Sequence, residues 1–207
     1  MATWIQSRAL QSNGKVIVFP ETVVPMWTEA TDLFWHDALD DLRARGKTIV
    51  VGAAVPRQAP AMPTSDFDEA LSVLRDGRMP VARPVPGPAD RSYLNTLIVR
   101  GEETGRYQQR IPVPFGMWRP LGGGGVPLNL LGPAVLDVDG GRVAPLLCYE
   151  TLLVWPVLQS MTKRPATILA AANDHWAVGE TLPRFQRTAV AVWARLFWIH
   201  HIVATNR

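Results

Sequence analysis

The sequence predicts an α/β fold formed by a single domain. An apolar, strand-like segment at residues 15–19, an amphipathic helical pattern at 31–45 and a second apolar segment at 48–54 follow one another along the chain. Strand–helix–strand alternation of this kind is typical of α/β proteins. The length of 207 residues and the apolar content of 47% are sufficient for one substantial hydrophobic core.

The other elements of the first half follow from local patterns. Residues 2–12 have the pattern of a helix that ends at an Asn-Gly pair. Residues 56–92 are rich in proline and predict a long surface excursion, with a short helix- or strand-like piece at 70–75. Residues 93–99 predict a strand, which Gly101 ends.

The second half begins with an extended segment and ends in a further strand–helix alternation. Pro112 excludes a helix at residues 106–113, so an extended conformation is predicted there. Residues 122–125 are four glycines without the Lys-Ser/Thr of a phosphate-binding loop, which predicts a flexible loop. The last elements predicted are helices at 151–161 and 183–196 and strands at 165–172 and 199–205.

Charge and cysteine content exclude several classes of function. The net charge is +3 and the basic residues are scattered, so we expect no direct contact with nucleic acid. A single cysteine excludes an internal disulfide framework, and the chain has neither a CxxC motif nor a His-rich metal pattern. We therefore expect no metal and no cofactor. The N-terminus has no signal-peptide pattern, and the most apolar segment, 189–204, is too short and too polar to span a bilayer.

The only cysteine, Cys148, lies at the end of an apolar run. Residues 143–147 lead directly into Cys148, Tyr149 and Glu150. Asp-Gly-Gly at 139–141 separates this run from another at 134–138, which predicts a hairpin because such turns need positive φ. We therefore expect Cys148 at the exit of a buried strand, where a scaffold can aim a nucleophile into a cleft. A lone cysteine is equally compatible with a buried apolar side chain, whereas a catalytic thiol would be reactive and partly exposed.

A carboxylate, Glu21, follows the first predicted strand. An acid at the tip of a buried strand points into the cleft that the sheet forms. The same position also suits a solvated loop acid or a cap for the next helix. Glu21 alone therefore does not decide between catalysis and structure.

Four motifs follow one another along the chain: Phe19-Pro20-Glu21, Pro114-Phe115-Gly116, Leu147-Cys148-Tyr149-Glu150 and Asn173-Asp174-His175-Trp176. Together they resemble the nitrilase (carbon–nitrogen hydrolase) superfamily. Within it they are most similar to the apolipoprotein N-acyltransferase branch, and in detail to plasmid conjugal-transfer proteins that carry the same domain. The resemblance implies an α/β/β/α sandwich in which residues 1–207 form one carbon–nitrogen hydrolase domain. It also implies a fragment of a longer protein that lacks the domain's first strand and closing strands.

The resemblance also implies roles for particular residues. Glu21 matches the general base and Cys148 the nucleophile, and Gln109 stands at the position of the family's catalytic lysine. The backbone N–H of Tyr149 would donate to the oxyanion. The residues implied to contact the substrate are Tyr149, Glu150, Met117 and Trp176.

Two departures from the family pattern leave two hypotheses for the function. Gln109 is neutral where the family has lysine, and Met117 replaces a glutamate; the neighbouring Arg110 should point to the other side of an extended segment. Loss of one oxyanion donor typically costs ~2.7–4 kcal/mol of transition-state stabilisation. The first hypothesis is hydrolysis or transfer of an amide or acyl ester by the Glu–Cys pair. The second is an impaired pseudoenzyme that serves as a binding or assembly module in plasmid conjugal transfer.

The resemblance implies partners of two kinds: a small-molecule amide or acyl substrate and proteins of the conjugation apparatus. The sequence leaves the oligomeric state open, with a homo-oligomer as one alternative. In the acyltransferase branch and its conjugal-transfer relatives, membrane helices lie outside this domain. We therefore expect contact with a membrane only through segments outside this chain, in a parent protein associated with the inner membrane.

Overall fold

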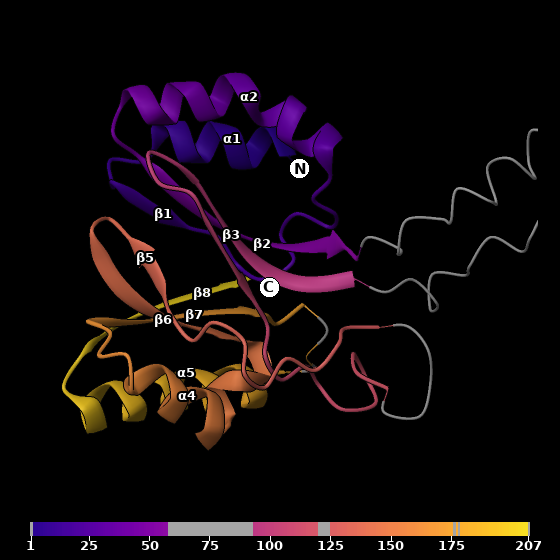
Figure 1. Ribbon diagram of the computed structural model, residues 1–207, viewed down its shortest axis with the longest axis vertical. Helices are drawn as coiled ribbons and strands as arrows, with labels where there is room; N and C mark the ends of the chain where they lie inside the picture. Colours follow the sequence, from indigo (N-terminus) through magenta and orange to yellow (C-terminus); the bar gives the residue numbers. More distant parts are fainter. Residues whose placement is uncertain (1, 58–92, 120–124, 176, 178, 207) are drawn as a thin grey trace, which may run out of the picture.

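The protein is a four-layer sandwich in which two sheets pack face to face and helices cover the two outer faces (Figure 1). The computed structural model describes residues 2–57, 93–119, 125–175, 177 and 179–206. Residues 58–92 of the predicted excursion, including its short piece at 70–75, and most of the glycine loop at 122–125 lie outside the described residues. The α/β class and the α/β/β/α sandwich are confirmed.

The first sheet has the strand order β1-β2-β3-β4. β1 and β2 are parallel, because the chain crosses the outer face through a helix between them, and the other neighbours are antiparallel. Two helices cover the outer face, α1 (Ala2–Gln11) and α2 (Glu29–Ala44). The strands are β1 (Val16–Val18), β2 (Thr48–Pro56), β3 (Tyr93–Gly101) and β4 (Gly105–Gln108).

The second sheet has the strand order β5-β6-β7-β8. The first two strands form the predicted hairpin, whose turn residues Asp139 and Gly140 have φ of 54° and 65°. The remaining neighbours are parallel and are joined through α4 (Val154–Met161) and α5 (Thr181–Phe197), which cover the outer face. The strands are β5 (Leu136–Val138), β6 (Gly141–Leu147), β7 (Thr167–Asn173) and β8 (His200–Asn206).

The core consists of three apolar layers that follow this architecture. The outer layers pack α1 and α2 on the first sheet and α4 and α5 on the second. The middle layer joins the sheets through buried side chains from both, including Leu97, Val99, Leu147 and Leu169. Polar side chains that point into this middle layer must find partners inside the protein, which makes its ends the places to look for a site. No helix among the described residues is long and apolar enough to cross a membrane.

Two predicted boundaries were wrong. The helix predicted from residue 151 begins at Val154, because Cys148–Leu152 forms a separate 3-10 turn that the Thr151 hydroxyl closes by donating to the Cys148 carbonyl at 2.7 Å. The extended segment predicted to run to residue 113 pairs with β3 only as far as Gln108. Beyond that point the chain turns inward toward the start of the 3-10 turn.

Candidate active site

The Glu21 carboxylate is held at one end of the middle layer by groups from both sheets. It is 4% exposed and lies just after β1. Its Oε1 accepts a hydrogen bond from Asn95 Nδ2 at 2.5 Å, and its Oε2 accepts one from the backbone N–H of Asn173 at 2.9 Å. Burial raises the pKa of Glu21, and the bonds from Asn95 and Asn173 oppose that rise. The carboxylate is therefore fixed in orientation and shielded from water.

The absence of a side chain at Gly52 allows the backbone at Glu21 to lie directly against β2. A Cβ at position 52 would lie 2.4 Å from the Pro20 carbonyl oxygen and 2.5 Å from Glu21 Cα, both far inside van der Waals contact. Val24 continues the contact by donating its N–H to the Gly52 carbonyl at 3.1 Å. A small residue in the second strand thus sets the position of the acid that follows the first.

Cys148 lies at the exit of β6, as predicted, and its thiol lies close enough to the Glu21 carboxylate for each group to shift the pKa of the other. Gln186 of α5 approaches the Sγ atom with its Nε2 at 3.5 Å. Burial, and then the negative charge of Glu21, raise the pKa of Cys148 to about 12, although Gln186 and the N–H of Tyr149 act in the opposite direction. The thiol is only 4% exposed, so it does not have the partly exposed, reactive setting expected from the sequence for a catalytic cysteine.

Gln109, at the position of the family lysine, is fully buried, and both the oxygen and the nitrogen of its side-chain amide form hydrogen bonds within the protein. Its Oε1 accepts from Asn95 Nδ2 at 2.9 Å, and its Nε2 donates to the Leu147 carbonyl at 3.3 Å. One Asn95 amide group therefore donates to both Glu21 and Gln109. The site has an acid, a thiol and two amides in contact, and the lysine position supplies no positive charge.

Glu150 lies on the other side of the chain from Glu21 and ties two segments together. The carboxylate is fully buried and accepts from the N–H groups of Arg110, Ile111 and Leu147 at 2.6, 3.1 and 2.9 Å and from the Tyr107 hydroxyl at 2.8 Å. Burial raises the pKa of Glu150, and Arg110 opposes this rise most strongly. These bonds engage both carboxylate oxygens with groups of the protein itself, so contact of Glu150 with a substrate stays a prediction.

The predicted orientation of Arg110 is confirmed. Its guanidinium is fully buried toward α4, where it donates to Gln159 Oε1 at 2.9 Å and Ser160 Oγ at 3.1 Å. Adjacent residues of an extended chain point to opposite sides, so Gln109 faces Glu21 while Arg110 faces the helix. Arg110, the cationic neighbour of Gln109 in the sequence, therefore forms its hydrogen bonds away from the Cys148 thiol.

The other three residues with implied substrate contacts are Tyr149, Met117 and Trp176. Tyr149 is half-buried, and its backbone N–H is directed at the Cys148 thiol. Met117 lies in the turn after Pro114 and is tied by its backbone to Val113 and Val126. Trp176 lies outside the described residues.

Sequence reasoning missed Asn95 and Gln186, which contact the acid and the thiol. A signal for Asn95 was present, because it is a polar residue on the inward-facing positions of a strand whose neighbours Leu97 and Val99 are apolar and buried. Gln186 gave no such signal, because an amphipathic helix carries many polar residues. Among the described residues, no group of three or more His, Cys, Asp or Glu side chains is placed to hold a metal ion.

A non-glycine residue with left-handed backbone lies in or directly after three of the four sequence motifs. Thr22 has φ of 53°, Phe115 of 61° and Cys148 of 46°. Such conformations cost energy for residues with a Cβ. The strand ends of the candidate site are thus built with backbone strain.

Comparisons with known proteins agree on the class to which this architecture belongs. No family model matches the chain. An amidase from Nesterenkonia sp. superposes with a TM-score of 0.58 at 16% identity, over 99% of this chain and 68% of that one. A variant of the Nesterenkonia AN1 amidase, described as a member of the nitrilase superfamily, gives a TM-score of 0.57 at 14% identity, over 99% of this chain and 69% of that one. The chain therefore has the fold of these amidases.

Proteins of similar sequence narrow the class of protein further. The chain is 30% identical to the conjugal transfer protein TraB of Agrobacterium fabrum over 203 residues, which cover 96% of this chain and 40% of that protein. It is 27% identical to the apolipoprotein N-acyltransferase of Pseudomonas syringae pv. tomato over 178 residues, 79% of this chain and 29% of that protein. The fold is thus nitrilase-like and the sequence is related to TraB and to apolipoprotein N-acyltransferases, of whose length the chain spans at most about two fifths.

Proposed function

We propose that residues 1–207 form one carbon–nitrogen hydrolase domain that cleaves or transfers an acyl group through Cys148, with Glu21 as the base. The proximity of the Glu21 carboxylate and the Cys148 thiol, both buried and each shifting the pKa of the other, carries this proposal. A related observation supports it: one structure of the Nesterenkonia amidase shows acrylamide added to that enzyme's active-site cysteine. The substrate class is an amide or an acyl ester.

The chemistry would proceed in two steps. Glu21 takes the proton from the Cys148 thiol as the sulfur attacks the carbonyl carbon, and the N–H of Tyr149 donates to the oxyanion. The C–N or C–O bond then breaks, the leaving group takes the proton from Glu21, and a thioester remains on Cys148. Water, or an acceptor amine, then attacks the thioester carbonyl as it gives a proton to Glu21. The C–S bond breaks, the acyl product leaves, and the Cys148 sulfur takes the proton back from Glu21.

The neutral Gln109 would make this site slow. With a pKa of about 12 the thiol is protonated near neutral pH, so the proton must move to Glu21 during the attack itself. A lysine at position 109 would favour the thiolate by its charge and donate to the oxyanion, whereas the Gln109 amide already serves Asn95 and Leu147. Loss of one such donor corresponds to about 10²–10³-fold in rate.

A second function is favoured by this same observation. The engaged amide of Gln109 and the high pKa of Cys148 suit a domain that retains the fold and has lost the reaction. In that case the domain acts as a binding or assembly module. In either case we propose that the longer parent protein acts in plasmid conjugal transfer, with proteins of the conjugation apparatus as partners and with any membrane contact through segments outside this chain.

The rate of Cys148 alkylation decides between the two functions. The chain has one cysteine, so a single labelled site is measured by mass spectrometry with iodoacetamide at several pH values. For a working pair, the folded wild type labels near neutral pH and Glu21→Gln slows the rate at least about tenfold, because the base is lost. Asp41→Asn, an exposed acid on α2, is the matched control and should leave the rate unchanged.

The outcomes separate the two functions clearly. Labelling that occurs only after denaturation, or that Glu21→Gln leaves unchanged, would reject the acyl-transfer proposal and leave the binding module. If the pair works, Gln109→Lys should speed turnover in a screen of small amides and acyl esters. A live thiol that Gln109→Lys does not accelerate would show that the missing lysine is not what limits the reaction.

A further inference from the structure

A pocket of about 480 Å³ lies on the helix-covered face of the first sheet, away from Glu21 and Cys148. Ile98 belongs to the outer apolar layer, and Arg106 is its partner on β4, so both project toward the helix side. Asn95 and Tyr107 occupy the alternate positions of the same two strands, so their side chains point to the other face of the sheet, into the middle layer with the candidate active site. The pocket is therefore separated from that site by the sheet itself. Its volume is within the range of small-molecule sites.

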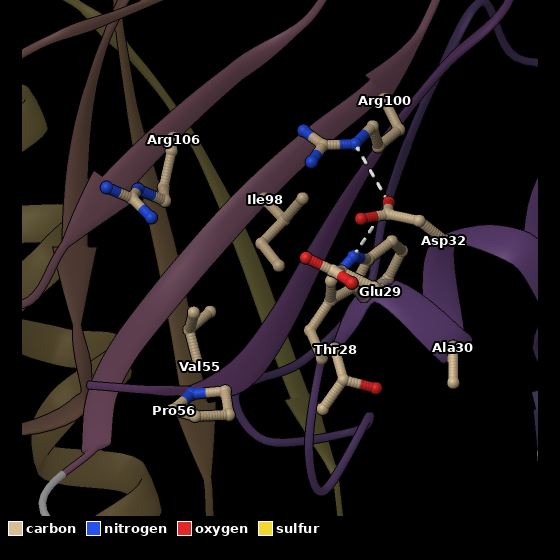
Figure 2. A pocket seen from close by; sticks show the side chains of 10 residues that line it. Thr28, Glu29, Ala30, Asp32, Val55, Pro56, Ile98, Arg100 and Arg106 are labelled. Atoms are coloured by element: carbon tan, nitrogen blue, oxygen red, sulfur yellow. Dashed lines mark hydrogen bonds and ion pairs between the residues drawn. The ribbon is translucent and has the colours of Figure 1, made fainter. Parts of the chain in front are cut away.

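One wall of the pocket is preorganised by an aromatic and charged cluster. Trp27 is 4% exposed and donates its Nε1–H to Asp32 Oδ1 at 2.9 Å. The same oxygen lies 3.6 Å from Arg100 Nε, and the Arg100 guanidinium lies over the Trp27 ring, 5.8 Å from its centroid. Figure 2 shows Asp32 and Arg100 meeting where the first turn of α2 faces β3. Asp32 neutralises Arg100, so this wall is held in place and carries no net charge.

Two further charged groups in the pocket have no such neutralisation. Arg106 and Glu29 line it, and neither forms a hydrogen bond or ion pair through its side chain with another described residue. Figure 2 shows Arg106 on the edge strand and Glu29 at the start of α2, with the apolar side chains of Ile98, Val55 and Pro56 between and below them. The pocket thus offers a guanidinium on one side, a carboxylate on another and an apolar floor.

We propose that this pocket binds a small zwitterion with an apolar side chain, of the amino-acid or dipeptide class. A ligand carboxylate would accept two parallel hydrogen bonds from Arg106, the geometry in which guanidinium groups bind carboxylates. A ligand ammonium group would pair with Glu29, and the aliphatic side chain would cover the floor formed by Val55, Pro56 and Ile98. This inference is independent of the acyl-transfer proposal, because it uses the other face of the sheet.

The test uses four chemically matched probes. L-leucine and L-leucyl-L-leucine carry both charges, isocaproate lacks the ammonium group, and isoamylamine lacks the carboxylate. Binding is measured by isothermal titration calorimetry, and the indole N–H resonance of Trp27 reports whether the ligand reaches this pocket. We expect at least one zwitterion to bind saturably with a Kd of about 1 mM or tighter. Removal of either charge should weaken binding about tenfold, as expected for a charge-assisted hydrogen bond.

Variants assign the binding to the two charges. Arg106→Gln should weaken binding of a zwitterion about tenfold and leave binding of isoamylamine unaffected. Glu29→Gln should also weaken binding of a zwitterion about tenfold, and it should leave binding of isocaproate unaffected. Arg195→Gln, an exposed arginine on α5, is the matched control and should change nothing. All three positions are exposed, so the variants should fold. Absence of saturable binding, equal binding of the singly charged probes, or binding that Arg106→Gln and Glu29→Gln leave intact would overturn the proposal.

Discussion

Replacement of Glu150 by glutamine tests whether the buried carboxylate is ionised and structural. Its oxygens face the N–H groups of Arg110, Ile111 and Leu147 as well as the Tyr107 hydroxyl. An acceptor-only group suits this arrangement, and the amide of glutamine would place its NH₂ against one of the N–H donors. A buried donor without a partner costs about 1–3 kcal/mol.

The charge of Arg110 adds to the expected loss. Its Nε lies 3.8 Å from Glu150 Oε1, and both side chains are fully buried. Removal of one member of a buried ion pair typically costs about 3–5 kcal/mol. Arg110 keeps its bonds to Tyr107, Gln159 and Ser160, so the lower end of the combined range, about 4 kcal/mol, is expected. That is a large part of the about 5–15 kcal/mol by which domains are usually stable.

Urea unfolding followed by tryptophan fluorescence measures this change in the free energy of unfolding. For a chain of this length, 4 kcal/mol corresponds to a fall in Tm of about 8–16 °C. The control is Asp41→Asn, which removes an exposed ion pair with Arg45. It should lower the free energy of unfolding by no more than about 0.5 kcal/mol. A loss below about 1 kcal/mol for Glu150→Gln would refute the reasoning, since it would mean that the carboxyl group is protonated when buried and is matched by an amide.

Two further perturbations test the site. The raised pKa of Cys148 predicts a loss of stability in alkali. The unfolded state releases its thiol proton near the ordinary pKa of 9.0, whereas the folded state holds the proton up to a pKa of about 12. The free energy of unfolding therefore falls as the pH rises between these values. By about pH 10 the wild type should have lost about 1.4 kcal/mol more than Cys148→Ala, measured by urea unfolding with reductant present, and parallel pH profiles would contradict this. Gly52→Ala should cost about 3 kcal/mol and alter the rate of Cys148 alkylation, because its Cβ collides with the backbone at Glu21. Gly116→Ala, where a Cβ meets only ordinary contacts, should cost under about 1 kcal/mol, and equal effects of the two glycine changes would count against the steric explanation.

Local patterns predicted the elements because each leaves a mark in the sequence. The hairpin before Cys148 was predictable from Asp139 and Gly140, since both adopt the positive φ that such a turn requires. Order along the chain then predicted that Glu21 and Cys148 follow buried strands. The start of α4 was not predictable, because the 3-10 turn before it depends on bonds from Leu147 to Glu150 and from Thr151 to Cys148 that form only in the folded protein.

The chemical state of the site could not be predicted from residue types. The sequence identified Gln109 in place of a lysine, but not that Asn95 and Leu147 would occupy its amide. Nor could it predict the pKa of Cys148, which depends on how completely the thiol is buried and on the charge beside it. Long-range contacts, between residues up to 152 positions apart, set these properties.

The left-handed conformations of Thr22, Phe115 and Cys148 set a limit on engineering this protein for heat resistance. Glycine adopts positive φ freely, and a residue with a Cβ costs roughly 1–2 kcal/mol there. A selection that rewards survival at high temperature would therefore enrich glycine at these three positions. It would raise the melting temperature while it removed the thiol and loosened the backbone next to Glu21. Libraries made for stability should keep these three codons fixed and spread their changes over the outer faces of the helices.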